Sequence, residues 1–196
     1  PAIQQAGLQK TLLSLHSYIK HAKLAMDPAS FPLITKIPDD MIQTTSEQLV
    51  KMGNLRSDPS ALGGYSLTDM GSAIAALGLE TRHGRFLYEC CHRGVGADGA
   101  RLVGLMGTDA HRFLVRKSIG DNGIATVQKA AKNARGDHLS MLNLYEKAAG
   151  DENWAASCHL NMPLLADINR FVATLFDRMS KLRLPLGEQG DRKTRD

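Results

Sequence analysis

At residues 164–179 the chain reads LLADINRFVATLFDRM, and this stretch decides the fold class. Its apolar residues recur every three or four positions, which is the spacing of one face of an α-helix. Because proline is favoured in the first turn of a helix, Pro163 predicts where this helix begins. We therefore expect one helix over residues 163–182. The residues expected to face the core are Ile168, Phe171, Val172, Leu175 and Met179.

The same spacing predicts helices through most of the preceding chain. The segments concerned are 3–24, 84–93, 97–106, 110–117, 122–134, 138–149 and 153–161. Asp137 is expected to cap the 138–149 helix, because a carboxylate accepts hydrogen bonds from the free N–H groups at a helix start. The polar tail, residues 185–196, is expected to fray. The fold class is therefore predicted to be mainly α.

The first 80 residues add a small β-hairpin to this pattern. Pro38 is expected in the first turn of a second helix, which Gly53 ends. The apolar face of that helix consists of Met41, Thr45, Leu49 and Met52. Turn-rich residues 54–66 predict the hairpin, and Thr68 predicts the N-cap of a third helix. Helix, loop, helix, hairpin and helix in this order outline a winged-helix domain.

Composition excludes several classes of protein. The three cysteines follow no regular spacing, which argues against a disulfide framework and favours an intracellular compartment. No apolar run approaches the ~20 residues that a membrane-spanning helix needs. Lys plus Arg total 24 against 20 Asp plus Glu, and this excess is too small to identify a nucleic-acid-binding protein. The chain starts with neither Met nor a signal peptide, so we expect a fragment of a longer protein.

Basic side chains gather in the middle third of the chain. Residues 82–135 hold 10 basic and 4 acidic side chains. Such a block could hold phosphates by displacing counterions, or it could be a set of solvated helix faces, and both interpretations stay open. Its candidate phosphate contacts are Arg112, Arg116 and Lys117.

Two short motifs suggest chemistry that their surroundings do not support. Residues 94–99 read GVGADG and match the G-x-G-x-x-G spacing of dinucleotide sites, but such a site needs a preceding strand, and residues 85–92 predict a helix. Cys90, Cys91 and His92 are adjacent, whereas zinc ligands are spaced so that they converge, so a buried thiol is the better interpretation. The sequence shows no G-x-x-x-x-G-K-[ST] phosphate loop, metal-binding pattern or evident nucleophile–base–acid set.

The order of several motifs resembles the helicase-associated region of DEAH-type RNA helicases. Residues 136–145 read GDHLSMLNLY and are similar to the family pattern [GS]-D-H-L-x-L-L-N-x-Y, which is the strongest single match. Residues 67–71, LTDMG, match L-T-x-L-G, and residues 52–55, MGNL, fall on the end of L-x-x-L-G-A-L. Residues 157–162, SCHLNM, are similar to W-C-x-x-N-F.

This resemblance implies a winged-helix domain over residues 1–80 and a helical ratchet domain over residues 81–184, ahead of a polar tail. In such helicases these domains lie behind two RecA-like motor domains, which use ATP and Mg²⁺, and help to form the channel for single-stranded RNA. An OB-fold normally follows. The chain departs from the family at Ala166, where the first arginine of R-S-L-R-R is expected, and at Asn169, which replaces another arginine.

The helix pattern and the resemblance together suggest residues that contact RNA. Arg170 is the strongest candidate, because it lies opposite the apolar face and a guanidinium can bind phosphate or stack on a base. Lys181 shares this side of the helix. Asn161 and Asn169 could hydrogen-bond a base or the backbone, and a helix-boundary role is an equal alternative for Asn161. His138 is expected to support the turn that begins its helix. The structural-motif residues are Asp137, His138, Leu139 and Cys158.

The leading hypothesis is an accessory module of a DEAH-type RNA helicase that lines the single-stranded RNA channel. Its expected partners are single-stranded RNA, motor domains and an OB-fold of the same protein, and a protein cofactor. The chain alone is expected to be no enzyme and to hold no cofactor, with ATP and Mg²⁺ in the parent motor domains. One alternative is a protein-docking scaffold derived from a helicase. Another is a winged-helix DNA-binding regulator, but Asp39, Asp40 and Glu47 in its recognition helix argue against it.

Overall fold

The computed structural model describes residues 2–32, 37–107, 126, 127, 129, 130, 132 and 136–187. They divide into two compact units, Pro1–Glu89 and Cys90–Asp196. All described elements are helices except for one two-stranded hairpin, so the prediction of a mainly α fold is confirmed. The division falls inside helix α4 (Thr81–His92), whereas the expected domain boundary lies just before this helix.

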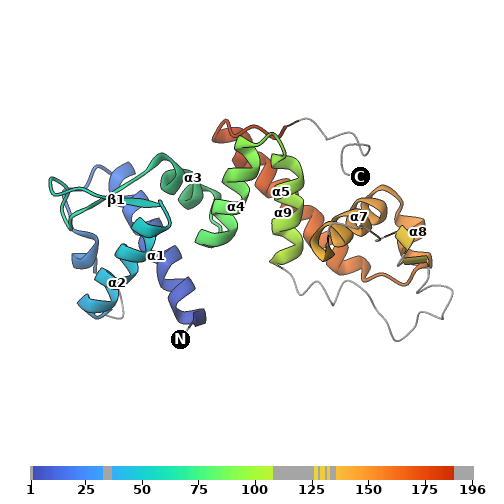
Figure 1. Ribbon diagram of the computed structural model, residues 1–196, viewed down its shortest axis with the longest axis horizontal. Coiled ribbons are helices and arrows are strands. Elements are labelled where there is room, and N and C mark those ends of the chain that lie inside the picture. Colours follow the sequence, from blue (N-terminus) through green and yellow to red (C-terminus); the bar gives the residue numbers. More distant parts are fainter. Residues whose placement is uncertain are drawn as a thin grey trace. The chain divides into compact units, whose positions relative to one another are not determined.

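The first unit consists of helices and a hairpin (Figure 1), which pack around a small aliphatic core. Its elements are α1 (Ala2–His21), the 3-10 helix η1 (Pro28–Ser30), α2 (Asp39–Lys51), β1 (Leu55–Ser57), β2 (Tyr65–Leu67) and α3 (Asp69–Leu77). The strands pair antiparallel, with Leu55 opposite Leu67. The core residues are Leu12, Leu13, Leu49, Leu55, Leu67 and Ile74. The predicted order of elements is therefore confirmed in this unit.

Hydrogen bonds of Thr68 join the hairpin to α3, as its predicted capping role requires. The Thr68 hydroxyl oxygen accepts a hydrogen bond from the N–H of Gly71 at 2.9 Å. The same hydroxyl lies 2.8 Å from the carbonyl oxygen of Gly53, to which it donates. The side chain thus holds the end of α2 and the start of α3 together, and the prediction of an N-cap is confirmed.

Two details of α2 differ from the prediction. Pro38 is the N-cap residue and does not lie within the first turn. Met41 is 41% exposed, whereas Ser46 is buried along with Thr45 and Leu49. The Ser46 hydroxyl donates to the carbonyl oxygen of Ile42, which satisfies it inside the helix and lets a polar residue occupy the buried face.

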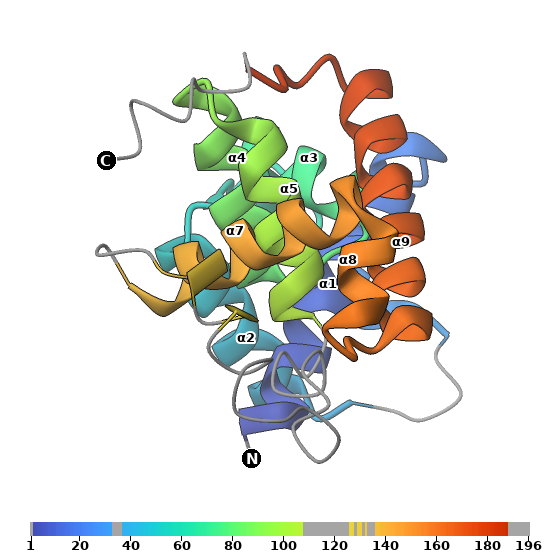
Figure 2. The same ribbon diagram turned by 90° about the vertical axis from the view of Figure 1, so that its right-hand side faces the viewer.

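The second unit is a helical bundle in which α5, α7 and α9 pack on one another and α8 packs on α7 (Figure 2). These helices are α5 (Gly96–Met106), α7 (Asp137–Gly150), α8 (Glu152–Ser157) and α9 (Met162–Lys181). The predicted helix over residues 110–117 lies outside the described residues, as does most of that over residues 122–134. The remaining predicted helices of this unit are confirmed within a few residues.

Asp137 is not the N-cap of α7 but its first residue, and Gly136 takes the capping position. Gly136 has φ of +127°, a conformation that glycine adopts much more readily than aspartate. The chain therefore turns one residue earlier than expected. Asp137 remains in the first turn, where its negative charge complements the positive end of the helix dipole.

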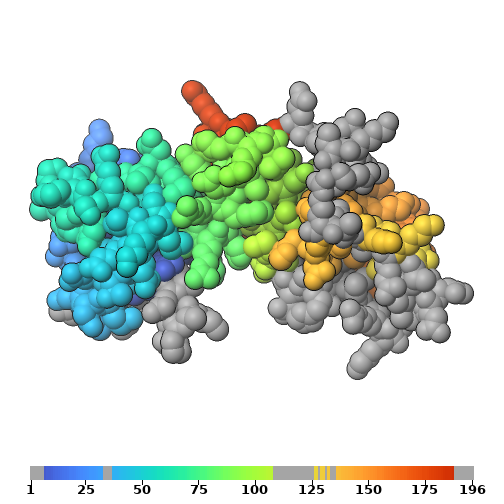
Figure 3. All heavy atoms as spheres, viewed as in Figure 1, coloured from blue at the N-terminus to red at the C-terminus, as the bar shows by residue number. Residues whose placement is uncertain are grey.

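The segment after α9 is hydrogen-bonded to the start of α5. The N–H of Ala97 donates to the carbonyl oxygen of Leu186 at 2.7 Å. In Figure 3 the red atoms of this segment lie against green atoms at the turn between α4 and α5. The expectation that the tail frays is therefore wrong for residues 185–187, because their backbone caps a helix end. Residues 188–196 lie outside the described residues.

Candidate nucleic-acid interface

Helix α9 begins at an asparagine cap. The Asn161 side-chain oxygen accepts a hydrogen bond from the N–H of Leu164 at 3.1 Å, and Pro163 lies in the first turn. This bond satisfies one of the four N–H groups that a helix start leaves free. Of the two roles weighed for Asn161, the structure shows the helix-boundary role. RNA contact by this residue stays a prediction.

The inner face of α9 is apolar. The residues predicted to face the core do so, except for Phe171. Its buried residues are Leu165, Ile168, Val172, Leu175 and Met179. Phe171 is 41% exposed, so its assignment to the core is wrong. Val172 packs closest to Gly104 of α5: a Cβ atom at Gly104 would lie 2.9 Å from the Cγ2 atom of Val172 and 3.7 Å from the Cδ1 atom of Phe171. The two helices approach so closely at Gly104 that the larger Phe171 ring lies at the edge of the contact.

The outer face of α9 carries the predicted cations. The Arg170 and Lys181 side chains are 80% and 73% exposed. They are eleven residues apart in the helix, which is about 16 Å along the axis and about three full turns. Both side chains therefore lie on the same side of α9. Asn161, at the far end of the helix, is too distant to share a nucleotide with Lys181. The helix therefore places Arg170 and Lys181 along one exposed strip, and the half-exposed Phe171 lies about 100° around the helix from Arg170, at its border with α5.

Each of these two cations has a carboxylate beside it. Arg170 pairs with Asp167, and the Lys181 ammonium lies 2.7 Å from the Asp177 carboxylate. Exposed pairs of this kind contribute only ~0–1 kcal/mol to stability, because water competes for both charges. A phosphate could therefore replace either carboxylate at little cost. The acids also lower the net positive charge of the strip.

Asn169 takes part in a contact between helices that the sequence did not predict. Its side-chain oxygen accepts a hydrogen bond from the Tyr145 hydroxyl at 2.7 Å, which joins α7 to α9. Tyr145 is only 5% exposed, and burial raises the pKa of its phenol. Nothing in the spacing of residues 145 and 169 indicates this pairing, which the tertiary packing creates. RNA contact by Asn169 stays a prediction. Because its side-chain oxygen already accepts the Tyr145 bond, the contact would use the NH2 group of the side chain.

An ionic cluster that joins α5, α7 and α9 was also not predicted from the sequence. Arg101 of α5 lies 3.0 Å from the Asp98 carboxylate and 3.4 Å from that of Glu146 on α7. Its guanidinium also stands 6.0 Å from the ring centre of Phe176 on α9. The Arg101 side chain is only 15% exposed, so this contact orders the bundle rather than facing a ligand.

The motif residues on α7 and after α8 divide into exposed and buried positions. Asp137 and His138 are exposed at the start of α7. Leu139 is partly buried against the core of the second unit, and Cys158 is 4% exposed within it. Leu139 and Cys158 thus pack in this core, and their assignment as family motif residues stays a prediction. Support of the turn by His138 stays a prediction.

The remaining candidates are the adjacent cysteines, a metal site and the basic residues of the middle third. Cys91 is 1% exposed, and burial raises its pKa to about 11, which confirms a buried thiol in its neutral form. Within the described ranges no three His, Cys, Asp or Glu side chains lie close enough to hold a metal ion. The described helices include none that is long and apolar enough to cross a membrane. Arg112, Arg116 and Lys117 lie outside the described residues.

Comparison with known proteins relates the chain to RNA helicases. It is 26% identical over 201 residues to the ATP-dependent RNA helicase DHX33 of Homo sapiens and 24% identical over 198 residues to DHX33 of Mus musculus. Both alignments cover 97% of this chain but 26% of the relative, so the chain spans about a quarter of their length. A shorter match, 32% identical over 69 residues, covers 34% of this chain and 10% of the ATP-dependent RNA helicase homolog DQX1 of Mus musculus. No family model matches the chain. Over nearly its whole length, the chain is therefore related in sequence to a segment of ATP-dependent RNA helicases.

Proposed function

We propose that this chain is the accessory, RNA-contacting part of a DEAH-type helicase, with the first unit a winged-helix domain and the second a ratchet domain. The exposed strip on α9, formed by Arg170 and Lys181 with the half-exposed Phe171 ring beside it, is the observation that carries this proposal. Cations at one side of a helix bind phosphates, and an exposed aromatic ring offers a surface on which a base can stack. Similarity to RNA helicases along nearly the whole chain supports the choice of RNA as the ligand.

In this proposal the chain supplies binding and guidance, not the chemical step. Motor domains outside this chain would bind ATP and Mg²⁺ and hydrolyse the nucleotide. The strip on α9 would hold the RNA backbone between successive movements of those domains. Motor domains and an OB-fold of the same protein, and a protein cofactor, would be its partners.

The test is a titration of the chain with a fluorescently labelled single-stranded RNA at several salt concentrations. Each phosphate contact contributes about 0.7 to the slope of log affinity against log salt for single strands. We expect Arg170→Ala to weaken binding and to reduce the slope by about 0.7, the share of one contact. Lys51→Ala removes an exposed cation from α2 in the other unit and is the matched control. Failure of the wild-type chain to bind RNA at any salt concentration would overturn the proposal.

A docking scaffold remains the second candidate, because one observation favours it. Asp167 and Asp177 stand beside the two cations and reduce the positive field that an RNA strand would meet. If Asp167 and Asp177 serve the docking of a protein partner, Asp167→Asn should not strengthen RNA binding. If RNA is the ligand, removing this negative charge should strengthen binding and raise the salt slope.

A further inference from the structure

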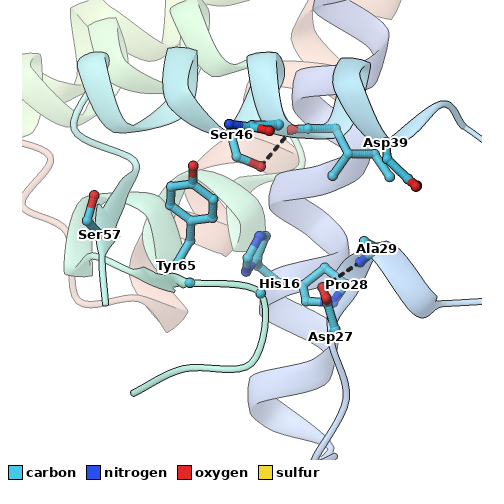
Figure 4. A pocket seen from close by; sticks show the side chains of 12 residues that line it. His16, Asp27, Pro28, Ala29, Asp39, Ser46, Ser57 and Tyr65 are labelled. Carbon is cyan, nitrogen blue, oxygen red and sulfur yellow. Dashed lines mark hydrogen bonds between the residues drawn. The ribbon is translucent and has the colours of Figure 1, made fainter. Parts of the chain in front are cut away.

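A hollow in the first unit has a buried histidine in its wall. The hollow has a volume of about 360 Å³ and lies between α1, η1, α2 and the hairpin (Figure 4). His16 of α1 lines it and is only 8% exposed. Among the described residues the imidazole has no hydrogen-bond partner, although the Asp27 carboxylate is near enough to act on its charge. No described residue uses the hydrogen-bonding capacity of this ring, so a ligand in the hollow can bond to it.

The charges around the hollow favour a cation. Asp27 and Asp39 line it, and no lysine or arginine is among its described lining residues. Burial lowers the pKa of His16, and the nearby Asp27 opposes this only in part. The ring is therefore neutral at neutral pH and offers one nitrogen as an acceptor. Among the described lining residues, an anion would meet two carboxylates and no lysine or arginine.

The positions of the hydrogen-bond acceptors in the hollow favour a guanidinium group over a metal ion. A metal ion is disfavoured, because the described residues contain no group of three or more His, Cys, Asp or Glu side chains suited to one. The acceptors come from separate elements, with His16 on α1, Asp27 before η1 and Asp39 on α2. A planar guanidinium has five donors in a fixed fork, so it can reach several such acceptors together. The Tyr65 ring, which also lines the hollow, offers an aromatic face to the same group.

A second hollow shares part of its wall with the first and carries the opposite charge. It shares His16, Pro28 and Tyr65 with the first and is also lined by Lys20 and Lys23. A ligand with a cation in the first hollow would place a neighbouring anionic group beside these lysines. Arginine itself has this arrangement of charges, and so does an arginine followed by an acidic residue in a peptide.

We propose that the two neighbouring hollows, which share His16 and Tyr65 in their walls, bind arginine through its guanidinium group, with Asp27 and Asp39 in the first hollow and Lys20 and Lys23 in the second. The arginine is either the free amino acid or a side chain of a peptide with an adjacent carboxylate. The site lies apart from the strip on α9, and the inference does not rest on RNA binding.

The test is an NMR titration of the labelled 196-residue chain that follows the His16 ring and Tyr65 signals. The ligands are L-arginine, L-citrulline as its uncharged counterpart, and an acetylated Arg-Asp dipeptide amide. We expect saturable shifts with a Kd on the order of 1–10 mM for so few contacts, and none with citrulline. Saturation by L-arginine alone would identify the free amino acid as the ligand, and saturation by the dipeptide alone would identify a protein segment. Both of these outcomes support the guanidinium site.

Two variants in the first turn of α2 provide the matched comparison. Asp39→Asn removes a carboxylate that lines the hollow, and Asp40→Asn removes its exposed neighbour, which does not. We expect Asp39→Asn to raise the Kd about tenfold, the loss of one charge-assisted hydrogen bond, while Asp40→Asn stays within about twofold. Equal shifts with citrulline, equal effects of the two variants, or no saturation by either arginine ligand at concentrations on the order of 50 mM would overturn the proposal.

Discussion

Asn54 is a polar residue whose side chain is buried without hydrogen-bond partners among the described residues. It is fully buried, and neither its side-chain oxygen nor its nitrogen has a hydrogen-bond partner among the described residues. The helicase pattern L-x-x-L-G-A-L, which residues 52–55 resemble, has alanine at this position. A buried amide without partners costs about 1–3 kcal/mol, which other interactions of the unit must offset.

Asn54→Ala should therefore stabilise the first unit. We expect the free energy of unfolding to rise by about 1 kcal/mol, since the gain from removing the unpaired amide exceeds the loss of a few packing contacts. Urea unfolding followed by circular dichroism measures this change. Asn54→Asp, which buries a charge of similar size at the same place, should destabilise the unit strongly. A loss of stability in Asn54→Ala would show that the amide has a partner that compensates its burial.

His16 makes stability depend on pH. Its pKa in the folded chain lies below the ordinary value of about 6.5, because burial disfavours the charged ring. As pH falls below about 6.5 the unfolded chain takes up a proton that the folded chain does not yet bind. Stability should therefore decrease from pH 7 toward the lowered pKa and then no longer change through this group. His16→Gln should make the decrease smaller in urea titrations at pH 7 and pH 5.5, and an unchanged decrease would contradict this origin.

At the scale of elements, Gly104 decides how closely α5 and α9 pack. An added methyl group would meet Val172 at 2.9 Å, well inside normal contact distance. Gly104→Ala should therefore destabilise the second unit by about 1–3 kcal/mol, despite the higher helix propensity of alanine. Gly7→Ala in α1, where no atom lies within 4 Å of the new group, is the control and should raise stability by up to about 1 kcal/mol. Thermal unfolding of both variants measures the difference.

The spacing of apolar residues predicts most of the helices. It predicts few of the contacts around α9 and His16. The spacing of apolar residues predicts α9 to within a residue of each end, and Thr68 predicts the start of α3. Periodicity misplaces Phe171, because it cannot show that Val172 packs closest to Gly104 on another helix while the larger ring stays partly exposed beside that contact. The bond from Tyr145 to Asn169 and the hollow around His16 likewise depend on residues far apart in sequence. Such features follow from tertiary packing, which local patterns do not encode.

At the scale of the whole chain, the two units have separate hydrophobic cores and should unfold in separable steps. Leu12 and Leu13 belong to the core of the first unit, and Leu142 and Leu165 to that of the second. The single tryptophan, Trp154, packs against the second core, so its fluorescence reports on that unit alone. Circular dichroism reports on helices of both. A chain of this kind need not unfold as one two-state system.

Core substitutions in each unit test this independence. Leu12→Ala should lower the stability of the first unit by about 2–5 kcal/mol and shift part of the circular dichroism transition, while the tryptophan transition keeps its midpoint. Leu142→Ala should shift the tryptophan midpoint by a comparable free energy. If either substitution moves both signals together, the chain unfolds cooperatively across α4, and the two units then act as one folding domain. Separate transitions would instead allow the strip on α9 and the His16 hollow to be altered one at a time, each with the other unit intact.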